Sequence, residues 1–141
     1  MVSKSFWIRG AGRKPDLRPA RRTRYLCSQR VAVPEIEIEP REVKRRLDAG
    51  ERMRMVDVRE PFEHRQANIG NAELIPMRGV PQSLESLRAT PEPLVLFCHH
   101  GMRSLQVVEW LRSQGLPNCQ SMAGGIDRWS VEIDPSVPRY Y

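Results

Sequence analysis

A short, wholly apolar run that ends at a cysteine constrains the fold of this 141-residue chain more than any other feature. Residues 94–97 read Leu-Val-Leu-Phe, Cys98 follows them, and a polar loop with one glycine leads into an amphipathic segment. An apolar run of this length, bounded by turn-forming residues, predicts a strand buried on both faces of a parallel sheet. Because ligands bind beyond the carboxyl ends of such strands, the pattern places Cys98 where chemistry is expected.

Strand-like and helix-like segments alternate along the chain from residue 34 onward. Strands are predicted over residues 35–38, 53–58, 72–75, 94–97 and 118–121. Helices are predicted over residues 40–49, 61–66, 80–88 and 103–114, and again after Gly125. Strands that alternate with helices predict an α/β fold, in which helices cover both faces of a parallel sheet. The predicted core includes Leu105, Val108, Trp110, Leu111 and Trp129.

The positive charge of the chain lies in its first 33 residues. They hold nine Lys or Arg and one acidic residue, whereas residues 34–141 hold fourteen basic and sixteen acidic residues. We therefore divide the chain into a basic leader, residues 1–33, which is expected to be disordered, and one folded domain, residues 34–141. A solvated tail or an over-extended reading frame explains the leader most simply. The alternatives are a transit peptide, an acidic protein partner and nucleic acid, against which the sparse aromatic residues argue.

The three cysteines, Cys27, Cys98 and Cys119, do not form a disulfide framework or a zinc motif. Their number is odd, and none of them makes a C-x-x-C pair. We therefore expect a reducing compartment, the cytoplasm, and no metal or other cofactor. Cys119 is interpreted as a small buried residue, with a resolving cysteine for Cys98 as the alternative. No apolar run approaches the roughly 20 residues that a membrane-spanning helix needs.

The loop after the predicted fourth strand carries the candidate site. Cys98 is the candidate nucleophile, because loop amides and the start of the next helix favour a thiolate there. An inert buried thiol is the alternative. Gly101 is expected to adopt a positive φ, and His99, His100 and Met102 complete the loop. The two histidines either contact substrate or form an exposed turn.

Three charged residues beside this loop leave alternatives open. Arg103 either grips an anionic substrate in forked geometry or pairs with an acid and makes the loop rigid. Asp57 and Arg59, at the neighbouring strand end, either support the cysteine loop by hydrogen bonds or form a surface ion-pair network. His64 is interpreted as a surface residue on a short helical turn.

At these residues the chain resembles a single-domain rhodanese, a sulfurtransferase. The resemblance covers about residues 35–141 and is carried by IEPREV at 38–43, VDVREPFE at 56–63, CHHGMRS at 98–104 and GGIDRW at 124–129. It implies a five-stranded parallel sheet flanked by helices, and a cysteine that takes a sulfane sulfur, becomes a persulfide and passes that sulfur on. Cys98 matches the persulfide-forming cysteine, His99 to Arg103 match the loop that cradles it, and Asp57 and Arg59 match positions that support the loop.

The resemblance implies partners as well as a reaction. These are a small sulfur donor such as thiosulfate and a thiol or cyanide acceptor, or a protein that carries the sulfur in a relay. Thiosulfate-using members carry basic residues straight after the cysteine, where this chain has His99 and His100. Related phosphatases and arsenate reductases have five residues between the cysteine and the arginine, and here four residues separate Cys98 from Arg103. This shorter loop favours sulfur over phosphate or arsenate.

Overall fold

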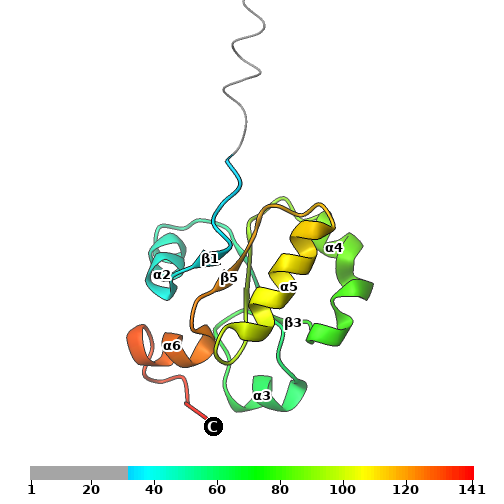
Figure 1. Ribbon diagram of the computed structural model, residues 1–141. Helices are drawn as coiled ribbons and strands as arrows, with labels where there is room; N and C mark the ends of the chain where they lie inside the picture. Colours follow the sequence, from blue (N-terminus) through cyan, green and yellow to red (C-terminus); the bar gives the residue numbers. More distant parts are fainter. Residues whose placement is uncertain (1–31) are drawn as a thin grey trace, which may run out of the picture. The chain divides into compact units, whose positions relative to one another are not determined.

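The computed structural model describes residues 32–141, which contain one five-stranded parallel sheet (Figure 1). The predicted basic leader, including Cys27, lies outside the described residues except for its last two. In chain order the strands are β1 (Glu37–Ile38), β2 (Arg54–Asp57), β3 (Glu73–Leu74), β4 (Leu94–Phe97) and β5 (Cys119–Met122). Their order across the sheet is β1-β5-β4-β2-β3, and every pairing is parallel. The predicted α/β fold is confirmed.

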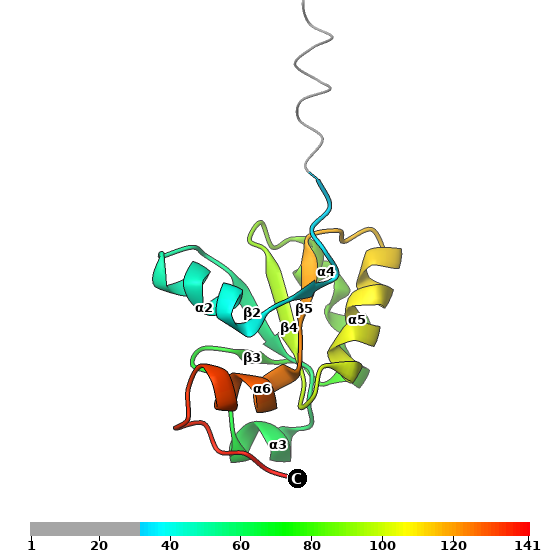
Figure 2. The same cartoon turned by 60° about the vertical axis from the view of Figure 1, so that its left-hand side comes forward.

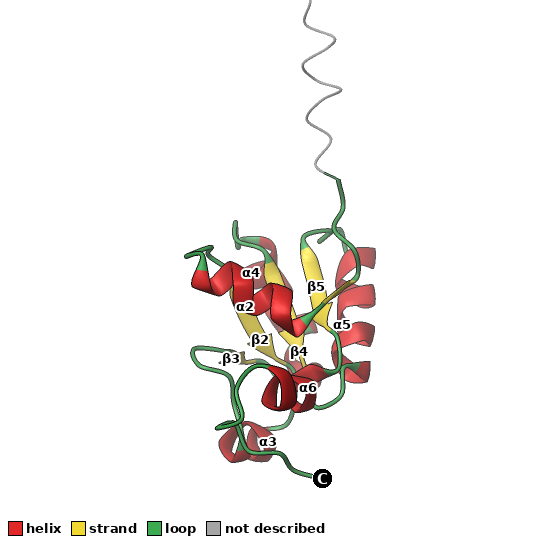
Figure 3. Cartoon of the chain, turned by 90° about the vertical axis from the view of Figure 1, so that its left-hand side faces the viewer, coloured by secondary structure: helices red, strands yellow, loops and turns green. Residues whose placement is uncertain are grey.

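Helices cover both faces of this sheet (Figures 2 and 3). The helices are α2 (Pro40–Asp48), α3 (Pro61–Gln66), α4 (Leu84–Arg88), α5 (Met102–Ser113) and α6 (Gly125–Glu132). Helices α4 and α5 lie over one face, and α2 and α6 lie over the other. The helix predicted over residues 80–88 is shorter than expected, because a 3₁₀ turn at Pro81–Ser83 precedes α4.

Strand β4 connects the two hydrophobic cores. Leu94 and Leu96 pack with the core under α5, whereas Val95 and Phe97 pack with the core under α2 and α6. All four side chains are buried. This two-sided burial explains why the run is wholly apolar rather than alternating.

Helix α5 buries Val108 and Leu111 as predicted, whereas Leu105 is only partly buried. The buried residues of this helix are Ser104, Val107, Val108 and Leu111. Trp110 is 36% exposed, so its assignment to the core was wrong. A polar residue, Ser104, takes part in the buried stripe because the stripe begins beside the sulfur of Cys98. Trp129 of α6 is buried as predicted.

The described helices include none with the length and hydropathy that crossing a bilayer requires.

Candidate active site

The sulfur of Cys98 lies at the N-terminus of α5, within reach of two backbone amides. Sγ accepts hydrogen bonds from the N–H of Gly101 at 3.1 Å and from the N–H of Ser104 at 3.4 Å. These are N–H groups that the first turn of a helix otherwise leaves without partners. The sulfur therefore occupies the place of an N-cap side chain, and the positive end of the helix dipole points toward it. The amide cradle predicted from the sequence is present, although Cys98 itself is only 1% exposed.

Gly101 turns the loop from Cys98 into α5. Its φ is +100°, a conformation that side-chain-bearing residues rarely adopt. A Cβ at this position would also lie 3.1 Å from the backbone nitrogen of Gly124. The predicted positive φ of Gly101 is confirmed.

The N-terminus of α6 holds the other side of the loop. The carbonyl of Cys98 accepts the N–H of Ile126 at 2.8 Å, and the carbonyl of His99 accepts the N–H of Asp127 at 3.1 Å. Gly125 makes this approach possible, because a Cβ there would lie 2.3 Å from the carbonyl oxygen of Cys98. The cysteine loop is thus held between the starts of two helices.

The two loop histidines differ in their surroundings. The ring of His99 stacks on His100, at 3.9 Å between centroids, and on Tyr140, at 4.0 Å. Burial and the neighbouring charge of His100 lower the pKa of His99, so this ring is neutral at neutral pH. His100 and Met102 are exposed and lie at the outer surface of the loop.

Arg103 pairs with an acid, which decides between its two predicted roles. Its two terminal nitrogens donate to the two carboxylate oxygens of Glu63, each at 2.8 Å. The pair with Arg103 lowers the pKa of Glu63 to about 2. Glu63 also accepts a hydrogen bond from the hydroxyl of Tyr140 at 3.0 Å. The guanidinium of Arg103 therefore makes the loop rigid by bridging α5 to α3.

Asp57 and Arg59 form a buried pair, so the interpretation as a surface ion-pair network was wrong. Both side chains are fully buried, and Arg59 donates to the two carboxylate oxygens of Asp57 at 2.8 and 2.6 Å. Arg59 also donates to the hydroxyl of Tyr140 at 2.9 Å. The pair thus reaches the cysteine loop indirectly, through Tyr140 and then Glu63. His64 lies 2.9 Å from Asp57 and is part of this network, contrary to its interpretation as a surface residue.

Comparison with known proteins identifies the family of this domain. The family model described as Rhodanese-like domain matches residues 39–132 of the chain. The chain belongs to the rhodanese-like domain family. The match contains the cysteine loop, the Asp57–Arg59 pair and the α6 glycines.

Several relatives share this domain. The "Rhodanese-like/PpiC domain-containing protein 12, chloroplastic" of Arabidopsis thaliana is 33% identical over 123 residues, and the match covers 82% of this chain but 40% of that protein. A rhodanese-like domain protein of Staphylococcus aureus superposes with a TM-score of 0.64 at 31% identity, covering 76% of this chain and all of the other. The human single-domain sulfurtransferase TSTD1 superposes with a TM-score of 0.61 at 27% identity, and the match covers 70% of this chain and 98% of that protein.

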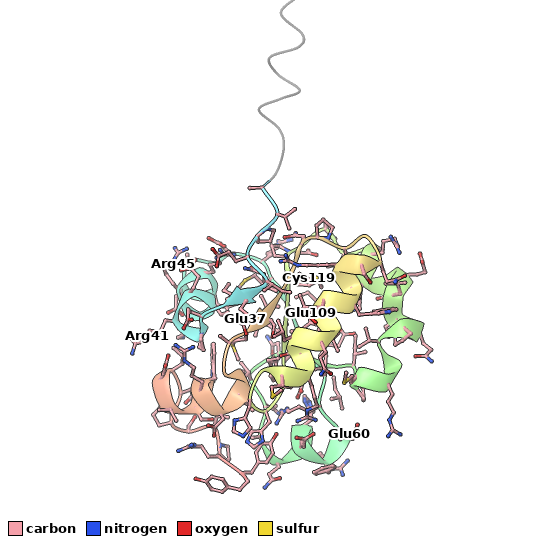
Figure 4. All side chains as sticks on the ribbon, viewed as in Figure 1. Glu37, Arg41, Arg45, Glu60, Glu109 and Cys119 are labelled. Atoms are coloured by element: carbon pink, nitrogen blue, oxygen red, sulfur yellow. The ribbon has the colours of Figure 1, made fainter. Side chains whose placement is uncertain are left out.

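The second described cysteine of this rhodanese-like domain lies far from the first. Cys119 begins β5 and pairs with Leu94, at the opposite end of β4 from Cys98. Its thiol donates to the carbonyl of Leu116 at 3.1 Å, and burial raises its pKa. Figure 4 shows Cys119 near one end of the sheet and Glu60, next to α3, near the other. The structure therefore favours a buried structural role for Cys119 over that of a resolving cysteine.

Sequence reasoning missed four residues of the site. Glu63 and Tyr140 connect Arg103 to the Asp57–Arg59 pair, Ser104 lies beside the sulfur, and Ser121 binds the hydroxyl of Ser104. A signal was present for Glu63, which follows a proline at the start of a short helix and accepts the N–H of Glu60 at 2.9 Å. Tyr140 and Ser121 are brought to the site by tertiary structure, whereas Ser104 directly follows the cysteine loop in the first turn of α5.

Proposed function

We propose that this rhodanese-like domain transfers sulfane sulfur through a persulfide on Cys98. The observation that supports the proposal best is the Cys98 sulfur held by two amides at a helix N-terminus. Such a cradle stabilises a thiolate, the form of cysteine that attacks sulfur. His99, His100, Gly101, Met102 and Arg103 form the loop around it.

The reaction has two balanced halves. In the first, the Cys98 thiolate attacks the outer sulfur of a donor persulfide, R–S–SH. A bond forms between Sγ and that sulfur, the donor S–S bond breaks, and its electron pair leaves with the donor as R–S⁻. In the second, an acceptor thiolate attacks the outer sulfur of Cys98–S–SH, and the Cys98 thiolate is released.

The geometry of Arg103 does not favour hydrolysis of phosphate esters at this loop. Hydrolysis of a phosphate ester by a cysteine needs an arginine that grips the phosphate in forked geometry. Both terminal nitrogens of Arg103 instead bind Glu63, a carboxylate that would repel a phosphate.

The charges around the loop favour a persulfide donor over thiosulfate. Arg103 is neutralised by Glu63, and Arg139 pairs with Asp127 at 2.8 Å. His99 is neutral at neutral pH because burial lowers its pKa. A thiosulfate dianion would therefore meet little net positive charge. We propose a low-molecular-weight or protein persulfide as donor and a thiol or a protein sulfur carrier as acceptor, with cyanide as an artificial acceptor.

We place this activity in a reducing compartment, the cytoplasm, and propose no metal or other cofactor and no nucleic acid for it. A reducing compartment keeps the Cys98 sulfur available as a thiolate. The two described cysteines are free, and they lie far apart, with Cys98 after the end of β4 and Cys119 at the start of β5 beside Leu94.

Two donors tested side by side examine this proposal. Purified protein receives thiosulfate or a cysteine persulfide, with cyanide as acceptor, and thiocyanate is measured beside Cys98→Ser. We expect Cys98-dependent turnover that is much faster with the persulfide. Hydrolysis of an aryl phosphate by the wild type, lost in Cys98→Ser, would contradict the proposal.

A further inference from the structure

We infer that Ser121, a buried serine on β5, is a positioning residue that directs the hydroxyl of Ser104 toward the sulfur of Cys98. The inference rests on the proposed function and concerns how its thiolate is stabilised. Ser104 lies in the first turn of α5, and its Oγ is 3.5 Å from Sγ and 2.7 Å from the Oγ of Ser121. Both serines are fully buried.

The number of protons on the two hydroxyls determines which serine donates the hydrogen bond to the other. Within the described part of the protein, the Ser121 hydroxyl has Ser104 as its side-chain hydrogen-bond partner. If Ser104 donated to Ser121, the proton of Ser121 would be left buried without an acceptor, which is costly. The satisfied arrangement therefore has Ser121 donating to Ser104, and Ser104 keeps its own proton for another acceptor.

Ser104 has two acceptors for that proton. One is the carbonyl of Gly101 at 3.2 Å, and the other is Sγ of Cys98 at 3.5 Å. The Gly101 carbonyl already accepts the N–H of Leu105 at 3.1 Å, so it stays satisfied when the hydroxyl turns away. A hydrogen bond to an ionised acceptor is stronger than one to a neutral acceptor, so a thiolate at Cys98 draws the proton toward Sγ.

This arrangement acts at two points of the reaction. It gives the Cys98 thiolate a third donor beside the amides of Gly101 and Ser104, which favours the nucleophile of the first half-reaction. In the second half-reaction the Sγ–S bond breaks and its electron pair returns to Sγ, where the same three donors receive the charge. Ser121 touches no reacting atom and acts through Ser104, since it holds the hydroxyl in one orientation.

Alkylation of Cys98 by iodoacetamide across a pH series tests the inference without a sulfur donor. The variants are Ser121→Ala, Ser104→Ala, the double variant and Ser121→Thr, which keeps the hydroxyl. The control is Ser130→Ala, which removes another buried serine hydroxyl, bound to the carbonyl of Ile126 in α6. Folding of each variant is checked by thermal unfolding.

We expect Ser121→Ala to lower the alkylation rate at pH 7 about three- to tenfold and to move the midpoint of the pH–rate profile upward, as loss of the neutral hydrogen bond that orients the Ser104 hydroxyl would. The double variant should match Ser104→Ala, because Ser121 acts only through Ser104. Ser121→Thr should restore the wild-type profile, and Ser130→Ala should keep it.

A wild-type profile in Ser121→Ala would overturn the inference, as would a double variant whose loss is the product of the two single losses. If Ser121→Ala does not fold, Ser104→Ala provides the test. An unchanged midpoint of the pH–rate profile in Ser104→Ala would contradict the inference that the Ser104 hydroxyl stabilises the Cys98 thiolate. The proposed function fails separately, if wild-type protein shows the expected profile and yet acquires no sulfur from any donor.

Discussion

Glu63 connects the cysteine loop to the Asp57–Arg59 pair through the side chains of Arg103 and Tyr140. It binds Arg103 through both oxygens, accepts the Tyr140 hydroxyl, and through Tyr140 reaches the Asp57–Arg59 pair. The side chain of Glu63 is 8% exposed and that of Arg103 is 36% exposed. Because the acid is buried and its partner reaches it from the surface, removal of the carboxylate charge leaves an incompletely paired arginine beside the loop.

Replacement of Glu63 by glutamine should therefore lower stability in a pH-dependent way. The pKa of Glu63 falls from 4.5 to about 2 on folding, so its contribution is complete above pH 4.5 and is lost as the pH falls toward 2. Denaturant unfolding at pH 6.5 should show Glu63→Gln less stable by about 2 to 3 kcal/mol. The gap between the two proteins should narrow as the pH falls from 4.5 to 2.

The matched control is Glu85→Gln. Glu85 is exposed and lies 3.7 Å from Arg88, and a pair of this kind contributes at most about 1 kcal/mol. A gap between wild type and Glu63→Gln that stayed constant from pH 6.5 to pH 2 would show that the ionised carboxylate is not what stabilises the loop.

At the scale of elements, the cysteine loop is held between α5 and α6. The amides of α5 point at the Cys98 sulfur, and the first amides of α6 bind the carbonyls of Cys98 and His99. Gly125 has no side chain to separate α6 from the loop. Precise placement of the sulfur thus depends on contact of the cysteine loop with the N-termini of both helices.

Gly125→Ala should displace the loop and lower stability. The new methyl group would overlap the Cys98 carbonyl at 2.3 Å, and the φ of +61° adds strain, so we expect a loss of about 2 kcal/mol or more. Sulfur transfer at the temperature where the variant is still folded should fall at least tenfold, since a misplaced reactive group costs up to about a hundredfold. Unfolding curves and persulfide formation measure the two effects.

Gly79→Ala provides the control for this substitution. Gly79 has an ordinary φ, and a Cβ there would meet its nearest neighbour, a methyl of Ile75, at 4.0 Å. If Gly125→Ala kept wild-type stability and activity, as Gly79→Ala is expected to do, the claim that Gly125 allows α6 to hold the cysteine loop would be contradicted.

Elements of this site that are encoded locally could be predicted from the sequence. The apolar run predicted the strand Leu94–Phe97, and the single glycine of a polar loop predicted the turn at Gly101. The contacts that fix the loop were not predictable in this way. Arg103 finds Glu63 across 40 residues, and Tyr140 reaches Glu63 across 77 residues, and no local pattern reports such pairs.

The burial of residues on α5 was also only partly predictable from the sequence, although these residues are close together in the chain. An apolar residue every three or four positions indicated the core face of this helix, yet Trp110 lies at the edge of that face and Ser104 lies inside it. Hydrophobicity alone does not place a polar residue in a core. Ser104 is buried because its amide and hydroxyl have partners there, namely Cys98 and Ser121.

At the scale of the whole molecule, the charge of the chain divides sharply along the sequence. The predicted leader, residues 1–33, has an excess of eight positive charges, whereas residues 34–141 have an excess of two negative charges. Both hydrophobic cores lie within residues 36–140. The residues of the candidate site also lie there.

A chain that begins at residue 32 should therefore keep the site intact. We expect it to form the Cys98 persulfide at the full-length rate, within about a factor of two, because basic segments act mainly through long-range, salt-sensitive attraction. Rates measured at low and at physiological salt with a neutral persulfide donor test this. A truncated chain that folds but fails to form the persulfide would assign the leader a part in the chemistry.

The most direct test of sulfur transfer at Cys98 is the intact mass of the protein after incubation with a cysteine persulfide. We predict a gain of one sulfur atom in the wild type, removed by cyanide or by an acceptor thiol and absent in Cys98→Ser. Thiosulfate should give the same product more slowly. No added sulfur in the wild type with any donor, or the same gain in Cys98→Ser, would contradict the claim that Cys98 carries the sulfur.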